Sequence, residues 1–425
     1  MVTLSQVRIN SRQKIDSYKE VDSRHYNNLM TCKDEVRSLK VVHINSSASG
    51  GGVAELLHSQ VNLERSLGMD SRWFVIEAPS GFFRVTKKIH NLLQGKKDFL
   101  TEGQKQVFSE TSKLLRRKLE QIAKKFSPDI IVIHDPQPIA LVEAVPPGIK
   151  KILRLHIDLS QPETRALEFI NPYLKQFDTV IVSNADYLEP IKNLTKSDGV
   201  IMPAIDPLAP KNLSISKDQA QAILRKLGID PLLPIITQVS RFDDWKNPSG
   251  LVRSFESLQK SHPDIQLVLA GFITAPDDPE AEKVFRKIRS LTEKNHNVHL
   301  FSDPDSLGSI SNDEFINALY TLSTAIVQNS LREGFGLTVT EAMWKGKPVV
   351  TGPARGFRLQ IDDRHNGFLT NNDRVLTKVL DDILKFSVDT EKVGKAARAS
   401  VGDKFLILRF VLENLQLYLK VLKEK

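Results

Sequence analysis

The chain has 425 residues, of which 40% are hydrophobic and 26% are charged, and it contains one cysteine. This composition excludes a disordered chain and a disulfide-built domain, and the length exceeds that of one ordinary core, so we expect two domains. The formal net charge of +8 favours anionic partners, and phosphate-bearing small molecules are one such class.

We expect neither a nucleic-acid partner, nor a membrane location, nor secretion, because the sequence lacks the signals for them. The sequence contains no RNA- or DNA-binding motif, so we expect no nucleic-acid partner. Its longest apolar runs, such as residues 130–133, are far shorter than the roughly 18 residues that span a bilayer. The first residues lack the apolar core of a secretory signal. We therefore expect no membrane association and a cytoplasmic location, with which a single cysteine is consistent.

In chain order, residues 1–37 are polar and mixed in charge and are interpreted as an N-terminal extension or a peripheral helical segment. A β-branched strand over 39–44 comes next, followed by a glycine-rich turn, a helix that opens at Val53 and a strand over 73–76. This alternation is typical of an α/β sheet.

The α/β pattern continues through the first half. A helix is predicted over about 100–125, followed by strands over 130–133, 152–155 and 179–182. Polar residues stand directly after these strands, where open parallel sheets bind their ligands. Among them are Asp135 and His156.

Three prolines in MPAIDPLAP, residues 202–210, predict a linker between two domains. A second α/β alternation follows. Its expected strands cover 235–239, 266–270, 298–301, 324–327 and 348–350, and its expected helices include 250–259 and one after Gly336. The last segment, 405–425, has the apolar stripe of a long amphipathic helix.

Gly50, Gly51 and Gly52 lie between a predicted strand and a predicted helix. Glycines there let the backbone approach a ligand, and a helix N-terminus favours an anion. The segment matches neither the dinucleotide-binding pattern nor the P-loop. A flexible turn without a ligand is therefore the alternative interpretation.

Arg241 and Lys246 lie in SRFDDWK, just after the predicted strand over 235–239. Arginine offers a planar fork and lysine a point charge, so the pair can clamp a diphosphate. Surface ion pairs with Asp243 or Asp244 are the alternative.

The segment EGFGLTVTE places Glu333 and Glu341 eight positions apart, with Gly334 and Gly336 between them at a predicted helix start. Free backbone N–H groups at such a start can face a phosphate or a sugar. A carboxylate can accept two hydrogen bonds from vicinal hydroxyls, as on a ribose or a hexose. This segment is the most specific signal in the sequence.

Together these motifs carry a family resemblance. The EGFGLTVTE segment, SRFDDWK and the early glycine loop resemble the retaining glycosyltransferases of family 4. HINSSASGGGVAELLHS, VIHDPQP and LRLHIDLS are similar to one branch, the trehalose glycosyltransferring synthases and the retaining trehalose phosphorylases. The resemblance covers residues 40–420.

The resemblance implies a GT-B fold, in which two Rossmann-like domains face a cleft and the last helix crosses back to the first domain. We expect an extension over 1–37, an acceptor domain over 38–205, a nucleotide-sugar donor domain over 206–400 and a returning helix over 401–425. It also implies a nucleoside diphosphate glucose as substrate, with no cofactor and no metal.

Roles are carried over residue by residue. Arg241 and Lys246 would hold the donor phosphates, Glu341 the nucleotide ribose and Glu333 the transferred glucose. The backbone of Phe335, Gly336 and Leu337 would meet the sugar hydroxyls and phosphate, and Gly51 and Gly52 the diphosphate. Asp135 and His156 would line the acceptor and the reaction centre.

The last two residues also suit this chemistry on their own. Asp135 can accept a hydrogen bond from an acceptor hydroxyl, and His156 can donate one to a glucose hydroxyl. His43, His58, His90 and His134 are weaker candidates.

One segment departs from the family pattern. After residue 350 the family has a glycine pair, whereas this chain reads TGPARGFRLQID, with Pro353, Ala354 and Arg355 before Gly356. This loop bears on the choice of donor.

The expected activity is reversible synthesis of α,α-trehalose from a nucleoside diphosphate glucose and glucose. A trehalose phosphorylase, another family 4 transferase, a non-catalytic sugar-nucleotide sensor and a basic nucleic-acid binder stay open as alternatives. The nucleotide is open too, and a homodimer is compatible with the family.

Overall fold

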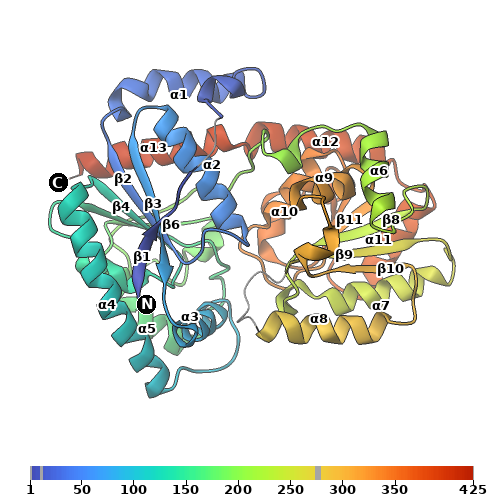
Figure 1. Cartoon of the computed structure of the whole chain (residues 1–425), viewed down its shortest axis with the longest axis horizontal. Coiled ribbons are helices and arrows are strands. Elements are labelled where there is room, and N and C mark those ends of the chain that lie inside the picture. Colours follow the sequence, from blue (N-terminus) through green and yellow to red (C-terminus); the bar gives the residue numbers. More distant parts are fainter. Residues whose placement is uncertain (1, 10–12, 273–278, 425) are drawn as a thin grey trace. The chain divides into compact units, whose positions relative to one another are not determined.

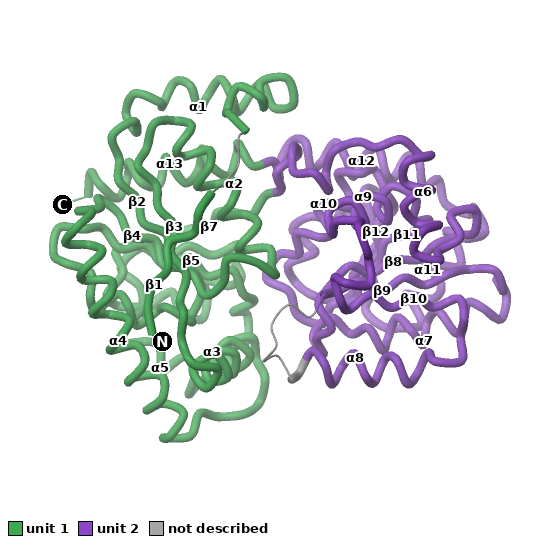
Figure 2. Tube along the Cα trace, viewed as in Figure 1, with its two compact units in different colours: residues 1–204, 407–425 green, residues 205–406 purple. Residues whose placement is uncertain are grey.

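The computed structural model describes residues 2–9, 13–272 and 279–424. The chain forms two compact units (Figure 2). Unit 1 contains residues 1–204 and 407–425, and unit 2 contains residues 205–406. Both are α/β layers, and each is described by itself below, with the elements labelled in Figure 1.

Within the described residues, unit 1 has a seven-stranded sheet in the order β1-β3-β2-β4-β5-β6-β7. All neighbouring strands are parallel except β1, which pairs antiparallel with β3. The strands are β1 (Thr3–Gln6), β2 (Lys40–Asn45), β3 (Asp70–Glu77), β4 (Ile130–His134), β5 (Lys150–Arg154), β6 (Thr179–Val182) and β7 (Asp198–Val200). Every residue of β4 is buried, as expected for a parallel strand covered on both faces.

Helices cover both faces of this sheet (Figure 1). On one face lie α3 (Ser80–Leu93), α4 (Glu102–Phe126) and α5 (Thr164–Leu174), and on the other lie α1 (Ser23–Val36), α2 (Gly52–Ser66) and α13 (Ile407–Lys423). The start of α4 is fixed by a capping box between Thr101 and Gln104. A large apolar core of β-branched strand residues and helix aromatics fills the α3–α5 side.

Residues 1–37, interpreted above as an extension, are an integral part of unit 1. They form β1 on the sheet edge and α1, which packs against α13. Leu4 on β1 and Leu29 and Val36 on α1 are buried. The polar composition did not indicate this packing, because one row of apolar residues is enough to dock an otherwise exposed helix.

Unit 2 has, in its described residues, a six-stranded parallel sheet in the order β10-β9-β8-β11-β12-β13. The strands are β8 (Ile235–Val239), β9 (Gln266–Ala270), β10 (Val298–Phe301), β11 (Ala325–Gln328), β12 (Val349–Thr351) and β13 (Phe368–Leu369). The central strand β8 has the bounds predicted from the sequence, because its apolar run is flanked by a proline and by polar residues.

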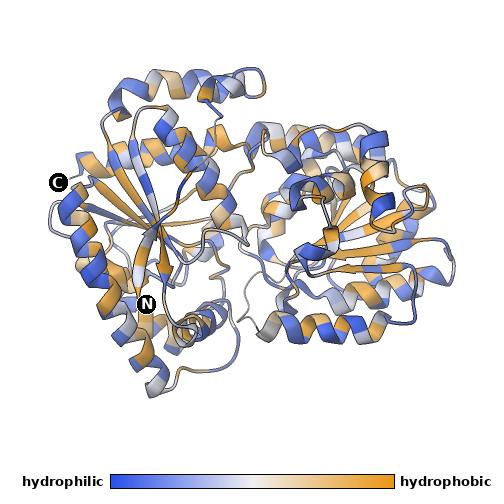
Figure 3. Ribbon diagram, viewed as in Figure 1, coloured by the Kyte–Doolittle hydropathy of each residue, from blue (hydrophilic) through white to orange (hydrophobic). Residues whose placement is uncertain are grey.

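Helices α7 (Pro248–Gln259) and α8 (Pro279–Thr292) lie on one face of the second sheet, with α11 (Asp373–Leu384) against α7. The other face carries α6 (Lys217–Lys226), α9 (Asn312–Leu322), α10 (Leu337–Trp344) and α12 (Thr390–Lys404). In both units the strands are hydrophobic, whereas outer helices such as α4 and α8 alternate in character (Figure 3).

The units meet in sequence close to the predicted boundaries. The first change falls at Ala204 and Ile205, inside the proline-rich segment. The second falls between Leu406 and Ile407, whereas the sequence placed it at 400/401, which lies inside α12. The final helix α13 belongs to unit 1, as the predicted fold class requires.

Both sheets contain a switch in strand order. In unit 1 the strands β3 and β4 lie on opposite sides of β2, and in unit 2 the strands β9 and β11 lie on opposite sides of β8. Ligands of open parallel sheets bind beyond the carboxyl ends of the strands at such a point. The predicted site residues follow these strands in both units.

Candidate active site

In unit 2, the loop after β8 presents the two predicted cations. Asp243 shapes this loop, because its carboxylate accepts a hydrogen bond from the Trp245 N–H at 2.9 Å and begins a short 3₁₀ turn. The Arg241 guanidinium lies 3.6 Å from the Asp243 carboxylate, and its side chain is 46% exposed. The Lys246 side chain is only 18% exposed. Arg241 is therefore open to a ligand, while Lys246 is held inside the site.

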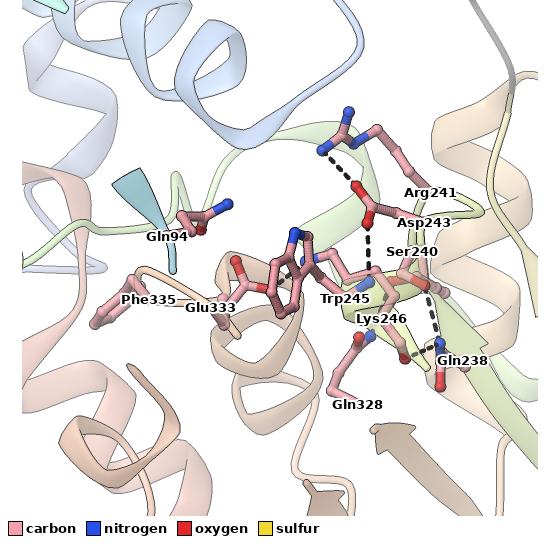
Figure 4. A network of polar contacts seen from close by, with 12 residues as sticks. Gln94, Gln238, Ser240, Arg241, Asp243, Trp245, Lys246, Gln328, Glu333 and Phe335 are labelled. Atoms are coloured by element: carbon pink, nitrogen blue, oxygen red, sulfur yellow. Dashed lines mark hydrogen bonds and ion pairs between the residues drawn. The ribbon is translucent and has the colours of Figure 1, made fainter. Parts of the chain in front are cut away.

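The loop after β11 meets the loop after β8. The Lys246 ammonium forms an ion pair with the Glu333 carboxylate (Figure 4). Two hydrogen bonds hold the loops in register: the Leu331 backbone N–H donates to the Trp245 carbonyl at 2.7 Å, and the Gln328 side-chain amide donates to the Val239 carbonyl at 2.8 Å. The structure thus brings together two residues that lie 87 positions apart in the sequence.

The glycine loop between Glu333 and α10 has a conformation that needs its glycines. Gly336 is the N-cap of α10 with a φ of 92°, and a Cβ there would lie 2.7 Å from the Phe357 ring. The Gln360 amide donates to the Phe335 carbonyl at 2.6 Å and accepts from the Thr340 hydroxyl at 2.6 Å. The Val339 N–H donates to the Gly336 carbonyl at 3.0 Å, so the Leu337 and Thr338 N–H groups are the ones that the start of α10 offers to a ligand.

The segment that departs from the family pattern supports this glycine loop. A Cβ on Gly356 would lie 2.7 Å from the Glu333 carbonyl, so the two backbones are in direct contact. The Ala354 N–H donates to the Ser330 carbonyl at 3.3 Å, and Ala354 is buried, whereas Arg355 is exposed. The small residues of the segment therefore pack, and Arg355 faces outward.

Glu341 lies one and a half turns into α10 and is buried. One of its oxygens lies 2.6 Å from the Lys211 ammonium, and the other accepts a hydrogen bond from the Tyr320 hydroxyl at 3.2 Å. Asn317 fixes the segment that carries Lys211, because its amide donates to the Pro210 and Leu213 carbonyls. Without a ligand, the predicted ribose acceptor is thus neutralised by a lysine.

Sequence reasoning missed three residues of this half-site: Lys211, Tyr320 and Gln360. Lys211 directly follows the proline-rich segment, and Tyr320 lies in an ordinary amphipathic helix, so neither stands out in a pattern. Gln360 belongs to the segment that departs from the family pattern. That departure was the only signal in the sequence that could have pointed to this residue.

In unit 1, the glycine turn, Asp135 and His156 follow β2, β4 and β5, which are neighbouring parallel strands. They therefore share one edge of the sheet. Gly51 is the N-cap of α2 in extended conformation, and Gly52 is the first residue of the helix. A Cβ on Gly51 would meet nothing within 4 Å, so this position is open.

Asp135 and His156 are in direct contact. Asp135 has a φ of 65°, a conformation that aspartate tolerates better than most residues, and its carboxylate accepts the backbone N–H of His156 at 2.7 Å. Burial raises the pKa of Asp135 to about 7, against the opposing effects of that hydrogen bond and of the Arg154 charge. Burial, and then the charge of Arg154, lower the pKa of His156 well below its ordinary value, so the ring is neutral at pH 7.

Two of the weaker histidine candidates extend this cluster. The Nδ1 atom of His134 lies 3.1 Å from Nε2 of His156, and Nε2 of His134 lies 3.1 Å from Nδ1 of His43. By contrast, His58 packs edge-on against Trp73, and His90 lies beside Asn91 and Gln94 on α3.

The predicted residues thus form two sets. Unit 1 brings together Asp135 and His156 with Gly51 and Gly52 on the same sheet edge, and unit 2 brings together Arg241, Lys246, Glu333 and the loop that leads to Glu341. Among the residues that the structure describes, no group of three or more His, Cys, Asp or Glu side chains is arranged to hold a metal ion. A search of the same residues finds no helix with the length and apolarity of a membrane span.

Family models match both units. Residues 43–189 match "Trehalose synthase, N-terminal domain", and residues 219–400 match "Glycosyl transferases group 1". Together the matches cover the glycine turn, Asp135 and His156 in unit 1 and all the predicted residues of unit 2.

The relatives extend over the whole chain. A trehalose synthase from Pyrococcus horikoshii is 36% identical over 415 residues, which cover 97% of this chain and 96% of the relative. A trehalose phosphorylase from Pleurotus pulmonarius is 27% identical, over 92% of this chain and 58% of the relative.

A solved sucrose-phosphate synthase from Thermosynechococcus elongatus has the same fold, with a TM-score of 0.70, 17% identity and coverage of 90% of this chain and 98% of that one. The predicted GT-B fold class and the resemblance to the trehalose branch of family 4 are therefore confirmed. The chain belongs to the trehalose synthase family, in the trehalose branch of family 4, and is a glycosyltransferase of trehalose metabolism with the GT-B fold.

Proposed function

We propose that the protein transfers glucose from a nucleoside diphosphate glucose to the anomeric hydroxyl of free glucose, reversibly and with retention, giving α,α-trehalose. The observation that carries this proposal is the half-site of unit 2. There an open guanidinium, a half-buried ammonium and the N-terminus of α10 offer positive potential, with a carboxylate beside them. A diphosphate bonded to a polyhydroxylated sugar matches that combination.

In this proposal Arg241 and Lys246 bind the diphosphate, and the Leu337 N–H at the start of α10 assists them. Binding of the diphosphate moves Lys246 from Glu333 to a phosphate oxygen, and the freed Glu333 accepts hydrogen bonds from the glucose. Glu341 similarly exchanges Lys211 for the vicinal hydroxyls of the ribose. The cations of the protein neutralise the leaving group, so we propose that no metal ion is required.

In the reaction, the bond from the anomeric carbon to the donor phosphate breaks, and a bond from that carbon to the acceptor oxygen forms on the same face. The proton of the acceptor hydroxyl passes to the departing phosphate oxygen. The protein acts by orienting both sugars and stabilising the charge on the diphosphate. Asp135 and His156 contact sugar hydroxyls near the anomeric carbon.

A trehalose phosphorylase is the second candidate, supported by the 27% identity to a protein of that name. Inorganic phosphate would then occupy the position of the diphosphate, with the same Arg241 and Lys246. When trehalose is cleaved, the two reactions differ in the atom that accepts the glucosyl group. It is a phosphate oxygen of a nucleoside diphosphate in the synthase and an oxygen of free phosphate in the phosphorylase.

The test uses the purified chain with trehalose and, separately, ADP, UDP, GDP or phosphate, in the presence of EDTA. Formation of nucleotide-glucose together with free glucose supports the synthase and names the base. Glucose 1-phosphate formed from phosphate alone supports the phosphorylase. If neither product forms in a folded sample that binds a nucleoside diphosphate glucose, trehalose is not the substrate. Activity that returns only when Mg²⁺ replaces EDTA would contradict the metal-free mechanism.

A further inference from the structure

A continuous row of buried polar side chains leads from the interior of unit 1 to His156. We call it the histidine chain, and its members in order are Glu64, His43, His134 and His156. Nε2 of His43 lies 3.1 Å from a Glu64 oxygen, and both ring-to-ring contacts also measure 3.1 Å. Glu64, His43 and His134 are almost fully buried, and only His156 reaches the edge of the sheet.

The inner end of the histidine chain is an ionised carboxylate. Burial alone would raise the pKa of Glu64, but the interaction with His43 and hydrogen bonds from His43, Ser71 and Gln60 outweigh it and lower the pKa. The Tyr418 hydroxyl of α13 also donates to Glu64, at 3.3 Å. A carboxylate with this many donors is satisfied without a proton of its own.

The Glu64 carboxylate fixes which atom donates at the first contact of the histidine chain. Because an ionised Glu64 can only accept, Nε2 of His43 must carry a hydrogen. We take His43 to carry a single N–H, like the two rings beyond it, as part of the inference drawn below. Its Nδ1 is then bare and accepts from Nε2 of His134, whereas an imidazolium at His43 would reverse the donor at both ring-to-ring contacts of the histidine chain.

The same reasoning applies at the next contact, where Nδ1 of His134 accepts from Nε2 of His156. Burial lowers the pKa of both His134 and His156 well below the ordinary value, which keeps these rings neutral. The single N–H of His156 is thus committed to the inside, and its Nδ1 is an acceptor.

We infer that the histidine chain holds His156 as the Nε2–H tautomer and presents its unprotonated Nδ1 to a hydroxyl of the bound sugar. Glu64, His43 and His134 are then positioning residues that act through His156. This assignment reverses the donor role that the lone residue suggested. Its catalytic part rests on the proposed function, because it assumes that His156 contacts a sugar during transfer, whereas the tautomer itself does not depend on any substrate.

The tautomer can be measured without turnover. The protein is labelled with 15N-histidine, and the Nδ1 and Nε2 signals of His156 are assigned by their loss in His156→Gln. In the wild type we expect a single species with the proton on Nε2. In His134→Phe, which removes the acceptor and keeps the ring volume, we expect a mixture of both tautomers.

Glu64→Gln is the second variant, because an amide presents both a donor and an acceptor to His43 and so no longer fixes the direction. Tyr418→Phe is the matched control. It removes a buried donor from Oε1 of Glu64 but leaves the contact of Oε2 with His43, so His156 keeps its single tautomer.

Turnover of trehalose tests the consequence. In His134→Phe and Glu64→Gln, kcat should fall by about 10- to 100-fold, the usual effect of losing a partner that orients a functional imidazole, while KM for the nucleotide stays unchanged. Tyr418→Phe should lose stability but keep kcat.

A wild-type His156 with its proton on Nδ1 would mean that His43 is an imidazolium, and it would overturn the inference. Unchanged kcat in both variants would overturn the positioning role. A wild-type protein with the expected tautomer and no action on trehalose would instead overturn the proposed function and leave the tautomer assignment supported.

Discussion

In unit 1 the residues after the strands belong to a buried network of side chains, whereas in unit 2 they are held by backbone contacts and carry opposite charges. Asp135 accepts the backbone N–H of His156, whose ring is the outer end of the histidine chain, while Lys246 and Glu333 form an ion pair on two touching loops. A neutral, hydrogen-bonded edge suits sugar hydroxyls, and a charged edge suits a diphosphate. Each difference can be tested by mutation.

The largest effect is expected at the charged edge. Arg241→Ala should reduce kcat/KM for the nucleotide-dependent reaction by about 10²–10³, because removal of one donor that stabilises a developing anion has that effect. Steady-state kinetics with trehalose and the active nucleotide measure it. Arg253→Ala is the control, since Arg253 is 60% exposed and pairs only at the surface with Asp373. Near-wild-type turnover of Arg241→Ala would remove Arg241 from the phosphate site.

The next effect concerns the ion pair between Lys211 and the buried Glu341 in unit 2. Lys211→Met leaves the buried Glu341 carboxylate without its cation, so the free energy of unfolding should fall by about 3 kcal/mol. Urea denaturation measures this loss. Saturation with the active nucleoside diphosphate should restore more of the stability of the variant than of the wild type, because the ribose hydroxyls take the place of Lys211. An equal gain in both proteins would contradict a ribose contact at Glu341.

A smaller effect tests the backbone support of the same edge. Gly356→Ala places a methyl group against the Glu333 carbonyl, 2.7 Å away, and should lower stability by about 1–3 kcal/mol. Activity should fall with it, because Glu333 moves with its loop. Gly103→Ala is the control, since a Cβ there meets nothing within 4 Å. If Gly356→Ala is destabilised but fully active, the loop does not position the sugar.

At the edge of the unit 1 sheet, a substitution is expected to raise the stability of the protein and not to lower it. The folded pKa of Asp135 lies at about 7, above the ordinary value of 3.8, so ionisation of this group favours the unfolded state. The wild type therefore loses stability from this group as pH rises from about 4 to 7. Asp135→Asn tolerates the same φ and keeps the acceptor for the His156 N–H.

Asp135→Asn should thus be more stable than the wild type by about 1–3 kcal/mol at pH 7.5, with no difference at pH 3.5. Thermal unfolding at a series of pH values measures the trend. The variant should also lose activity, because the amide is a weaker acceptor for the sugar hydroxyl. A stability gap that does not change with pH would mean that the Asp135 carboxyl keeps its ordinary pKa.

The residues that follow the strands of the two sheets also differed in how far their arrangement could be predicted from the sequence. The strands and the turn residues of both followed from periodicity, so the α/β class, the two halves and the order of Arg241, Lys246 and Glu333 along the edge of the second sheet were predictable. The contact between Glu333 and Lys246 was not predicted, because no pattern within one sequence joins residues 87 positions apart.

The buried network of unit 1 was not predictable. His43 and His134 lie in strands whose other residues are mostly apolar, and Glu64 lies on an amphipathic helix where a carboxylate normally faces water. Their partnership depends on the register of β2 against β4 and on α2 packing over the sheet. These are tertiary facts, and a one-residue shift in register would remove them.

The return of α13 to unit 1 affects how the protein is made. Unit 1 is discontinuous in sequence, and α13 leaves the ribosome only after all of unit 2. Until then α1 lacks its packing partner, and Glu64 lacks the Tyr418 hydroxyl. Unit 2 can therefore complete its core first during synthesis, although most of unit 1 is translated before it. The unit that is translated first can thus be the last to complete its packing.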